Sequence, residues 1–336
     1  MNLNERIDAF SQLGTRIREL PSAEHQNLAE KAAAQNPWFS PENVKRALDG
    51  IEKFLSEPAL IRWTSSYALP QNQIKTVGVA MAGNIPLVGF HDYLSVLISG
   101  HRIQIKLSTQ DQVLLPYLNN LLLDIEPRFD PFITLADRLH GYQMAIATGS
   151  NNTARYFNHY FKSVPHLIRK NRSSCAILMG EESAKEIENL GNDVFTYFGL
   201  GCRNVSKLYV PEDYDFIPLL RTWEKYMPVR DHNKYTNNYQ YQRTIHLMNQ
   251  KHFYDNGAVL LIEDERLVSP IATVFYEKYT DQEDLKARLS RQKGNIQCVV
   301  SAQGWFKGSI EFGKTQQPEL WDYADGADTL QFLTTP

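Results

Sequence analysis

The sequence predicts an α/β protein in which helices cover parallel sheets and the chain forms two domains. From about residue 75 onward, short runs rich in β-branched and aromatic residues alternate with helical patterns. Strict alternation of this kind is typical of parallel sheets with helices on both faces. A length of 336 residues exceeds one typical domain and fits two domains, or one large α/β unit with an extension. With 22% charged residues and a net charge of −3, the chain has no general attraction for nucleic acid or anionic membranes.

Two amphipathic helices are predicted ahead of the first strand. In the first, apolar residues recur every three or four positions from Leu3 to Leu20. Ser40, Pro41 and Glu42 have the pattern of an N-cap, a first-turn proline and a first-turn acid, and they predict that a second helix begins there. We expect these helices to form an N-terminal cap.

The alternating part of the chain predicts two series of strands and helices. The first series has strands at residues 76–80, 102–107, 132–135 and 144–147, with helices at 86–98 and 113–125. The second series has strands at 175–179, 207–210, 259–262, 272–276 and 296–300, with helices before Cys202, near 216–226 and at 283–292. The two series predict two domains that meet near residue 175.

Residues 226–243 form a polar and aromatic stretch without clear periodicity. The stretch contains Tyr235, Tyr239 and Tyr241. We expect a loop here, which is either a plain surface loop or one that lines a substrate entrance or a subunit contact.

Three cysteines are spread along the chain without a C-x-x-C pair, so their spacing predicts neither a disulfide framework nor a metal site. Cys175 and Cys298 lie in apolar, strand-like runs and are expected in the core. Cys202 follows Gly199 and Gly201 at the end of a predicted helix, whose apolar face is formed by Ile187, Leu190, Val194 and Phe198.

A glycine-flanked turn can lift Cys202 out of regular structure, and Arg203 beside it favours a thiolate over a thiol. Cys202 is therefore a candidate nucleophile. The alternative is a buried and inert thiol, which is the usual environment of a lone cysteine.

The N-terminus carries charge where a secretory signal would be apolar, and no run of eighteen apolar residues occurs. These features predict a cytoplasmic protein without a membrane span.

Four motifs follow one another along the chain. They are Gly83-Asn84-Ile85-Pro86 after a strand, Lys106-Leu107-Ser108 at the end of a strand, Ala147-Thr148-Gly149-Ser150 between a strand and a helix, and Gly201-Cys202 after a helix. Together they resemble the aldehyde dehydrogenase superfamily, and within it a short form of the long-chain acyl-CoA reductases first associated with bacterial luminescence. The similarity runs from about residue 75 to 300.

The resemblance implies an aldehyde-dehydrogenase-like α/β fold with two domains. Residues 1–175 are expected to combine the helical cap with a dinucleotide-binding parallel sheet. Residues 176–304 are expected to form an α/β catalytic domain that carries Cys202. Residues 305–336 are candidates to pack back on the first domain.

The resemblance also implies the catalytic residues. Cys202 would be the nucleophile, and the side chain of Asn84 would join the backbone N–H of Cys202 in binding the oxyanion of the tetrahedral intermediate. On the residues alone, Asn84 is equally well explained as a turn asparagine.

Five residues are implied to bind the cofactor: Lys106, Ser108, Thr109, Gly149 and Ser150. Ser150 begins a helix whose N-terminus suits a pyrophosphate, although alone it is an ordinary N-cap. Lys106 lies toward the adenosine ribose in the family, although alone it is equally a surface lysine. Thr109 stands where many NAD-preferring relatives have a glutamate. Because a carboxylate repels a 2′-phosphate and a hydroxyl tolerates one, we expect NADPH as the cofactor.

Residues 151–180 contain no Asp or Glu, whereas hydrolytic aldehyde dehydrogenases have a glutamate here that activates water. An acyl thioester on Cys202 would then exchange with a thiol or accept hydride, which is the chemistry of a CoA-linked reductase. The basic residues Arg169, Lys170 and Arg172 either attract the CoA phosphates or form a solvated face. One departure from the family is Arg266, which aligns with a glutamate that binds the nicotinamide ribose.

Three hypotheses follow. The first is NADPH-dependent reduction of a fatty acyl-CoA to its aldehyde through a thioester on Cys202. The second is an acyl carrier or transferase that uses Cys202 without a redox step and passes the acyl group to a partner protein. The third is a catalytically silent scaffold of the same fold. The resemblance also implies a homo-oligomer.

Overall fold

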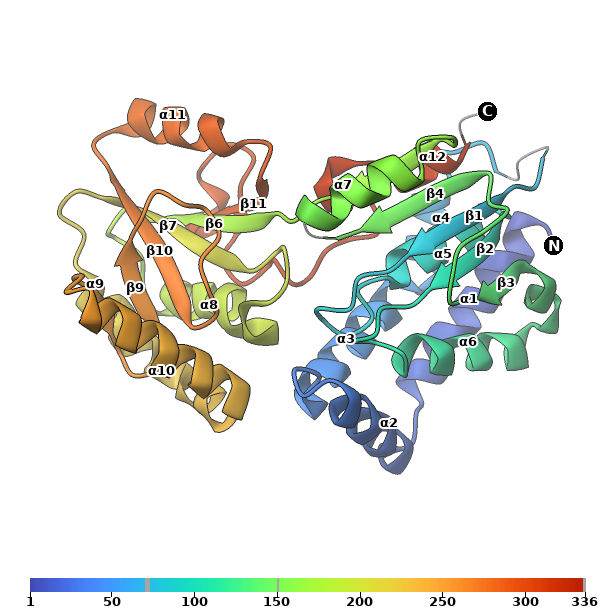
Figure 1. Ribbon diagram of the computed structural model, residues 1–336, viewed down its shortest axis with the longest axis horizontal. Helices are drawn as coiled ribbons and strands as arrows, with labels where there is room; N and C mark the ends of the chain where they lie inside the picture. The colour runs from blue at the N-terminus through green and yellow to red at the C-terminus, as the bar shows by residue number, and fades with distance from the viewer. Residues whose placement is uncertain (70–72, 150, 335–336) are drawn as a thin grey trace. The chain divides into compact units, whose positions relative to one another are not determined.

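The computed structural model describes residues 1–69, 73–149 and 151–334. It divides the chain into two compact units, which are Met1–Asn171 with Glu319–Pro336 (unit 1) and Arg172–Pro318 (unit 2) (Figure 1). The sequence placed the division near residue 175 and the return of the chain at 305, whereas unit 2 begins at Arg172 and the chain returns to unit 1 at Glu319. The assignment of cofactor binding to unit 1 and catalysis to unit 2 stays a prediction.

Unit 1 begins with the helices α1 (Leu3–Arg18), α2 (Ser22–Gln35), α3 (Pro41–Phe54) and α4 (Glu57–Thr64). The two predicted helices correspond to α1 and α3. Asn2 and Glu5 form a capping box that fixes the start of α1. Helix α2 was not predicted, because its only buried residues are Leu28, Ala29 and Ala32 and its apolar stripe is weak. Apolar side chains of all four helices share one core with the sheet of unit 1.

The sheet of unit 1 is parallel and has the order β3-β2-β1-β4-β5. Its strands are β1 (Thr76–Ala80), β2 (Arg102–Lys106), β3 (Ile133–Leu135), β4 (Met144–Thr148) and β5 (His166–Arg169). Its helices are α5 (Phe90–Ile98), α6 (Leu114–Ile125), α7 (Asn151–Tyr160) and α12 (Thr329–Thr334), with 3₁₀ segments η1 (Pro127–Phe132) and η5 (Ala324–Gly326). The strand order reverses between β1 and β4, and ligands of such sheets bind at the carboxyl ends of the strands beside this switch point.

Helices cover both faces of this sheet, as the alternation predicted (Figure 1). In β4, Met144 and Ile146 join the core that contains α5 and α6. Ala145 and Ala147 point to the other face, where Phe161 follows α7.

Arg169 lies at the end of β5, a strand that was not predicted from the sequence. The residue is 5% exposed, and one terminal nitrogen of its guanidinium donates to both carboxylate oxygens of Asp92 on α5 at 2.7 Å. The other terminal nitrogen donates to Thr329 Oγ1 at 2.6 Å. The expectation that Arg169 binds CoA phosphates or belongs to a solvated face is therefore wrong. Its ion pair instead ties the edge strand β5 to α5, and its hydrogen bond to Thr329 ties the strand to α12.

Asp92→Ala is expected to destabilise unit 1 by about 3–5 kcal/mol, because it leaves the buried guanidinium of Arg169 without a counter-charge. Chemical unfolding followed by circular dichroism measures this loss. Asp49→Ala, which breaks the exposed Lys45–Asp49 pair, is the control and should leave the unfolding midpoint unchanged. Asp92→Leu combined with Arg169→Met should recover most of the stability, and a double variant as unstable as Asp92→Ala would contradict the role of the ion pair.

Unit 2 contains a seven-stranded sheet in the order β12-β11-β6-β7-β10-β9-β8, parallel except for the β8–β9 pair. Its strands are β6 (Ser173–Ile177), β7 (Val205–Pro211), β8 (Tyr254–Asp255), β9 (Leu260–Glu263), β10 (Thr273–Tyr279), β11 (Ile296–Ser301) and β12 (Ile310–Glu311). The α-helices are α8 (Ala184–Phe195), α9 (Phe216–Thr222), α10 (Asn233–Met248) and α11 (Gln282–Gln292). The 3₁₀ segments are η2 (Thr196–Gly199), η3 (Trp223–Asp231) and η4 (Ala302–Gly304).

Within unit 2, α11 covers one face of the sheet, and α8 and α9 cover the other (Figure 1). Leu208 of β7 packs in the core that contains α8 and α9. Its neighbour Tyr209 packs with Leu285 and Leu289 of α11.

The prediction of a loop over residues 226–243 is wrong, because η3 and α10 occupy most of it. Helix α10 buries Tyr235, Tyr239 and His246, which lie on one side at helical spacing. Two of these side chains are tyrosines that also form hydrogen bonds, with Tyr235 Oη donating to Ala258 O at 3.0 Å. An inward face built from such residues gives little apolar periodicity, which explains why the sequence did not reveal the helix.

Candidate active site

Cys202 lies in a tight turn between α8 and β7 of unit 2, where the glycine pattern predicted a turn. Helix α8 ends before Tyr197 and Phe198, which take left-handed conformations with φ of 53° and 57°. The prediction that Phe198 belongs to the apolar face of the helix is therefore wrong. Its ring packs against His232 instead, with ring centres 4.4 Å apart.

The side chain of Asn204 holds this turn together. Its Nδ2 donates to the carbonyl oxygens of Asp193, Val194 and Thr196 at 3.0, 3.4 and 2.7 Å. Its Oδ1 accepts a hydrogen bond from the backbone N–H of Gly201 at 2.8 Å. The last carbonyls of a helix have no partner inside the helix. One buried amide therefore ends α8 and fixes the chain at the start of β7, with the candidate nucleophile between its contacts.

Asp193 and Arg203 attach the same turn to residues 313–315. The buried Asp193 carboxylate accepts hydrogen bonds from Gly313 N at 2.6 Å and from N and Oγ1 of Thr315 at 3.1 and 2.7 Å. Arg203 Nε donates to Thr315 O at 2.7 Å. Burial raises the pKa of Asp193 to about 6, although its hydrogen bonds lower it. Residues on both sides of Cys202 are thus held by one segment.

The three thiols have different surroundings. Cys175 on β6 is fully buried, and burial raises the pKa of its thiol far above the usual range. Cys202 and Cys298 are half-buried. The expectation that Cys298 lies in the core is therefore wrong, although it does belong to a strand, β11. Ser174 Oγ lies between them, donating to Cys202 O and accepting from Cys298 N, each at 3.1 Å. Cys202 alone combines partial exposure with a position outside regular structure.

The predicted cofactor motifs of unit 1 lie at the carboxyl ends of the strands of its sheet. Ala80 at the end of β1 pairs with Lys106 of β2 and with Ala147 of β4, so the loops after these strands begin together. The first two loops approach closely, because a Cβ added to Gly83 would lie 2.6 Å from the Cβ of Ser108. Glycine is therefore required for this approach beside the switch point.

Asp111 links the same two loops. Its carboxylate accepts hydrogen bonds from Leu87 N at 2.9 Å and Leu114 N at 3.4 Å, and burial raises its pKa to about 6. Leu87 has a φ of 57°, and residues 86–89 form a turn. Helix α5 consequently begins at Phe90 instead of at the predicted residue 86.

The side chains of Lys106 and Thr109 are exposed at the carboxyl end of β2 and in the loop after it. The ammonium of Lys106 forms no ion pair with any residue in the described ranges. The loop at Thr109 is held through its backbone, because Gln35 Nε2 donates to Thr109 O at 3.2 Å. Ser108 Oγ accepts a hydrogen bond from Gln110 N at 3.2 Å and so stabilises its own turn.

Gly149 lies just before α7. A Cβ added to Gly149 would lie only 3.0 Å from Thr153 Cγ2, which is closer than an ordinary contact. Ser150 lies outside the described residues. Asn84 is half-buried in the loop after β1. Because Asn84 belongs to unit 1 and Cys202 to unit 2, their joint role in binding an oxyanion stays a prediction.

The side chain of Arg266 makes two contacts within unit 2. Its guanidinium pairs with Asp264 at 2.6 Å and lies over the Phe275 ring, 4.8 Å from the ring centre. The alignment of Arg266 with a ribose-binding glutamate stays a prediction from the resemblance.

The structural roles of Asn204, Asp193 and Asp111 were not predicted from the sequence. Asn204 had a local signal, because an asparagine soon after two glycines is typical of a turn. Asp193 had none, since its partners lie 120 and 122 positions further along the chain. Such long-range contacts leave no trace in a single sequence.

No group of His, Cys, Asp and Glu side chains in the described ranges is arranged to hold a metal ion. Among the helices of those same ranges, none has both the length and the apolar character that a membrane span requires.

Solved structures of aldehyde dehydrogenases have the same fold. The NAD⁺ complex of an aldehyde dehydrogenase from Bacillus cereus matches with a TM-score of 0.66 at 13% identity, covering 90% of this chain and 72% of that one. An NAD-dependent aldehyde dehydrogenase from Sinorhizobium meliloti matches with a TM-score of 0.67 at 11% identity, covering 94% and 72%. A mutant of aldehyde dehydrogenase C from Pseudomonas syringae, complexed with NAD⁺ and octanal, matches with a TM-score of 0.65 at 11% identity, covering 90% and 72%.

These likenesses confirm the predicted aldehyde-dehydrogenase-like α/β fold. At such low identities they establish the fold alone. No protein-family model and no curated protein sequence matches the chain.

The stability of unit 2 is expected to depend on Asp193 between about pH 4 and 6. Because burial raises the pKa of this carboxyl from 3.8 to about 6, the folded chain binds the proton more tightly than the unfolded chain. Its contribution to stability is therefore complete at low pH and is lost as the pH rises through 6, with a slope of up to about 1.4 kcal/mol per pH unit.

Urea unfolding across this pH range, monitored by fluorescence of the buried Trp223 of unit 2, measures the effect. Asp193→Asn should remove the slope from this signal, and the matched variant Asp111→Asn in unit 1 should not. Identical pH profiles for Asp193→Asn and the unchanged protein would show that Asp193 does not titrate as described.

Proposed function

We propose that the protein reduces a fatty acyl-CoA to its aldehyde with NADPH, through an acyl thioester on Cys202. The observation that carries the proposal is the position of Cys202 on a turn that Asn204 and Asp193 fix from both ends. A nucleophile needs such a fixed and partly exposed position. The aldehyde-dehydrogenase fold supports an oxidoreductase acting on aldehyde or acyl groups, and the octanal bound to the Pseudomonas syringae protein supports an apolar substrate.

The residues of unit 1 fit a dinucleotide. Gly83 and Gly149 keep the backbone beside the switch point free of Cβ atoms, and Gly149 leads into the N-terminus of α7, where an anion is favoured. Lys106 and Thr109 would hold the adenosine ribose and its 2′-phosphate, because they offer an exposed cation and a hydroxyl. NADPH, when bound, would supply the hydride that reduces the acyl carbon.

The chain's own chemistry centres on the sulfur of Cys202. Its thiolate attacks the carbonyl carbon of the acyl-CoA, a C–S bond to Cys202 forms, the C–S bond to CoA breaks, and CoA leaves as a thiol with the proton that Cys202 gave up. The backbone N–H of Cys202 and the amide of Asn84 would stabilise the oxyanion, each worth about 3–4 kcal/mol of barrier. When the aldehyde leaves, the C–S bond to Cys202 breaks and the sulfur takes up a proton.

The composition of residues 151–180 supports reduction over hydrolysis. This stretch contains no Asp or Glu that would activate water against the thioester. Its strand β5 ends in Arg169, which is buried in an ion pair. The acyl group on Cys202 would then be transferred to hydride or to a thiol.

Acyl transfer without reduction is a second candidate function. Arg266, paired with Asp264, supports this alternative, because the family pattern has a ribose-binding glutamate at this position. Cys202 would then pass its acyl group to another thiol, such as one on a partner protein. Self-association of the chain stays a prediction from the resemblance.

Cys202→Ser is expected to reduce acyl-CoA-dependent NADPH oxidation by at least about a thousandfold, because a hydroxyl is a much weaker nucleophile than a thiolate. The matched control is Cys298→Ser, which removes the other half-buried thiol and should retain activity. Absorbance at the nicotinamide band, together with trapping of the aldehyde, measures turnover. Undiminished turnover in the Cys202 variant would rule out a thioester on this residue.

Thr109→Glu is expected to weaken NADPH relative to NADH by about tenfold or more, because the new carboxylate repels the 2′-phosphate. The backbone of this exposed loop is held by Gln35, so the substitution should leave the fold intact. The ratio of kcat/KM for the two cofactors is the measurement. Gln110→Glu places the same charge on the neighbouring exposed residue and serves as the control. An unchanged ratio in Thr109→Glu would show that Thr109 does not face the ribose.

A further inference from the structure

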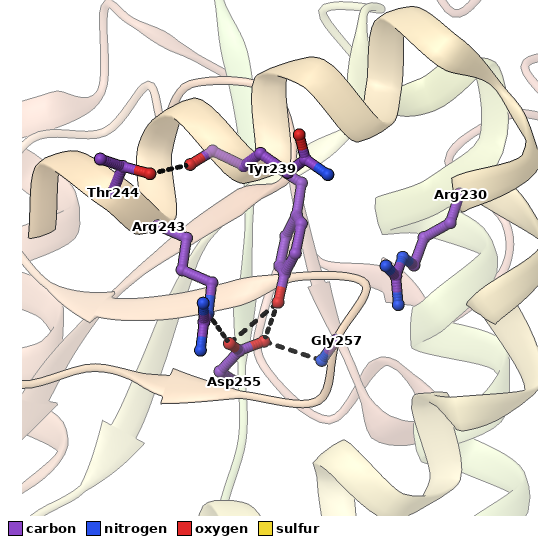
Figure 2. Close-up of a pocket in the computed structure, with 7 residues that line it drawn as sticks. Arg230, Tyr239, Arg243, Thr244, Asp255 and Gly257 are labelled. Atoms are coloured by element: carbon purple, nitrogen blue, oxygen red, sulfur yellow. Dashed lines mark hydrogen bonds and ion pairs between the residues drawn. The ribbon is translucent and has the colours of Figure 1, made fainter. Parts of the chain in front are cut away.

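A polar cavity of about 640 Å³ opens on the surface of unit 2. It is bounded by the end of η3, by α10, and by the end of β8 with the residues that follow it (Figure 2). Its lining includes Arg230, Tyr239, Arg243, Thr244, Asp255 and Gly257. The lining contains no aliphatic side chain. The volume of the cavity lies in the range of pockets that bind small organic molecules.

The only carboxylate of the cavity is already fully engaged. Asp255 accepts hydrogen bonds from Tyr239 Oη at 2.7 and 2.9 Å, from Arg243 Nε at 3.0 Å and from Gly257 N at 2.7 Å (Figure 2). These four contacts use both carboxylate oxygens and balance the charge of Asp255 against that of Arg243. The carboxylate therefore has little capacity left to bind a further cation.

The guanidinium of Arg230 stands apart from this network (Figure 2). Its carbon lies 5.6 Å from the centre of the Tyr239 ring, and no residue of the described chain accepts a hydrogen bond from it. The terminal nitrogens of Arg243 likewise have no described acceptor, since Arg243 contacts Asp255 through Nε. Two guanidinium groups thus present donors to the cavity, and one of their positive charges is unbalanced.

Gly257 lies beside Arg230 in the wall of the cavity. It has a φ of 88°, a conformation that favours glycine, and an added Cβ would lie 3.5 Å from Arg230 Nη1. The added Cβ would make an ordinary van der Waals contact there, so it is the positive φ that favours glycine at this position.

We propose that this cavity binds the phosphate group of a small organic molecule. Planar guanidinium groups match phosphate oxygens with paired hydrogen bonds, and an unbalanced positive charge favours an anion. The cavity is larger than a phosphate ion, so it would also hold an organic part such as a nucleoside. The proposal is independent of the acyl-CoA reductase function, because all lining residues belong to unit 2 and none is a predicted catalytic or cofactor residue.

Titration calorimetry of the full chain with inorganic phosphate, ADP and adenosine 3′,5′-bisphosphate tests the proposal. ADP or the bisphosphate should bind saturably and more tightly than inorganic phosphate. Arg230→Gln should weaken the binding by about tenfold to a hundredfold, the value of a charge-assisted hydrogen bond. This variant breaks no ion pair among the described residues, so its fold should be retained.

Two control variants separate this site from the others. Arg221→Gln removes an exposed arginine of α9 outside the cavity and should leave the affinity unchanged. Thr109→Glu alters the predicted cofactor site in unit 1 and should also leave it unchanged. Absence of saturable binding by all three probes, or binding that Arg230→Gln does not weaken, would overturn the proposal. Neither result would bear on the chemistry of Cys202.

Discussion

The hydrogen bonds of the Asn204 side chain fix the path of the chain between α8 and β7. The end of a helix leaves carbonyl oxygens without partners, and the chain must turn sharply to enter the next strand. Asn204 meets both requirements, because its amide nitrogen binds the carbonyls at the end of α8 and its oxygen binds Gly201. Asp193 then ties the same turn to Thr315. Buried polar contacts thus determine the position of Cys202. These contacts depend on both α8 and β7 being folded.

In unit 1, buried polar contacts likewise fix the loops at the switch point of the sheet. Gly83 and Ser108 bring two loops into contact, and the buried carboxylate of Asp111 holds them through the backbone of Leu87. In both units a buried polar side chain fixes a connection of the sheet. Asp111 holds the loops that follow β1 and β2, and Asn204 holds the turn that precedes β7. Thr109 lies exposed on one of these loops, the one that follows β2.

Most strands were predictable because their apolar runs are short and separated by clear turn signals. Helix α10 was not, because Tyr235 and Tyr239 face inward with hydroxyls that need partners. Arg169 had the pattern of a surface cation, and its burial depends on Asp92, which is 77 positions away in the sequence. For the candidate site, the turn at Cys202 followed from local glycines, whereas the contacts that fix it depend on long-range pairing.

The most direct measurement is the intact mass of the protein after incubation with long-chain acyl-CoAs, with and without NADPH, followed by peptide mapping. A thioester mechanism predicts one acyl adduct on Cys202 that disappears with release of aldehyde when NADPH is added. An adduct that persists with NADPH would contradict reduction and support acyl transfer. Absence of an adduct on Cys202 for every chain length would contradict the thioester itself.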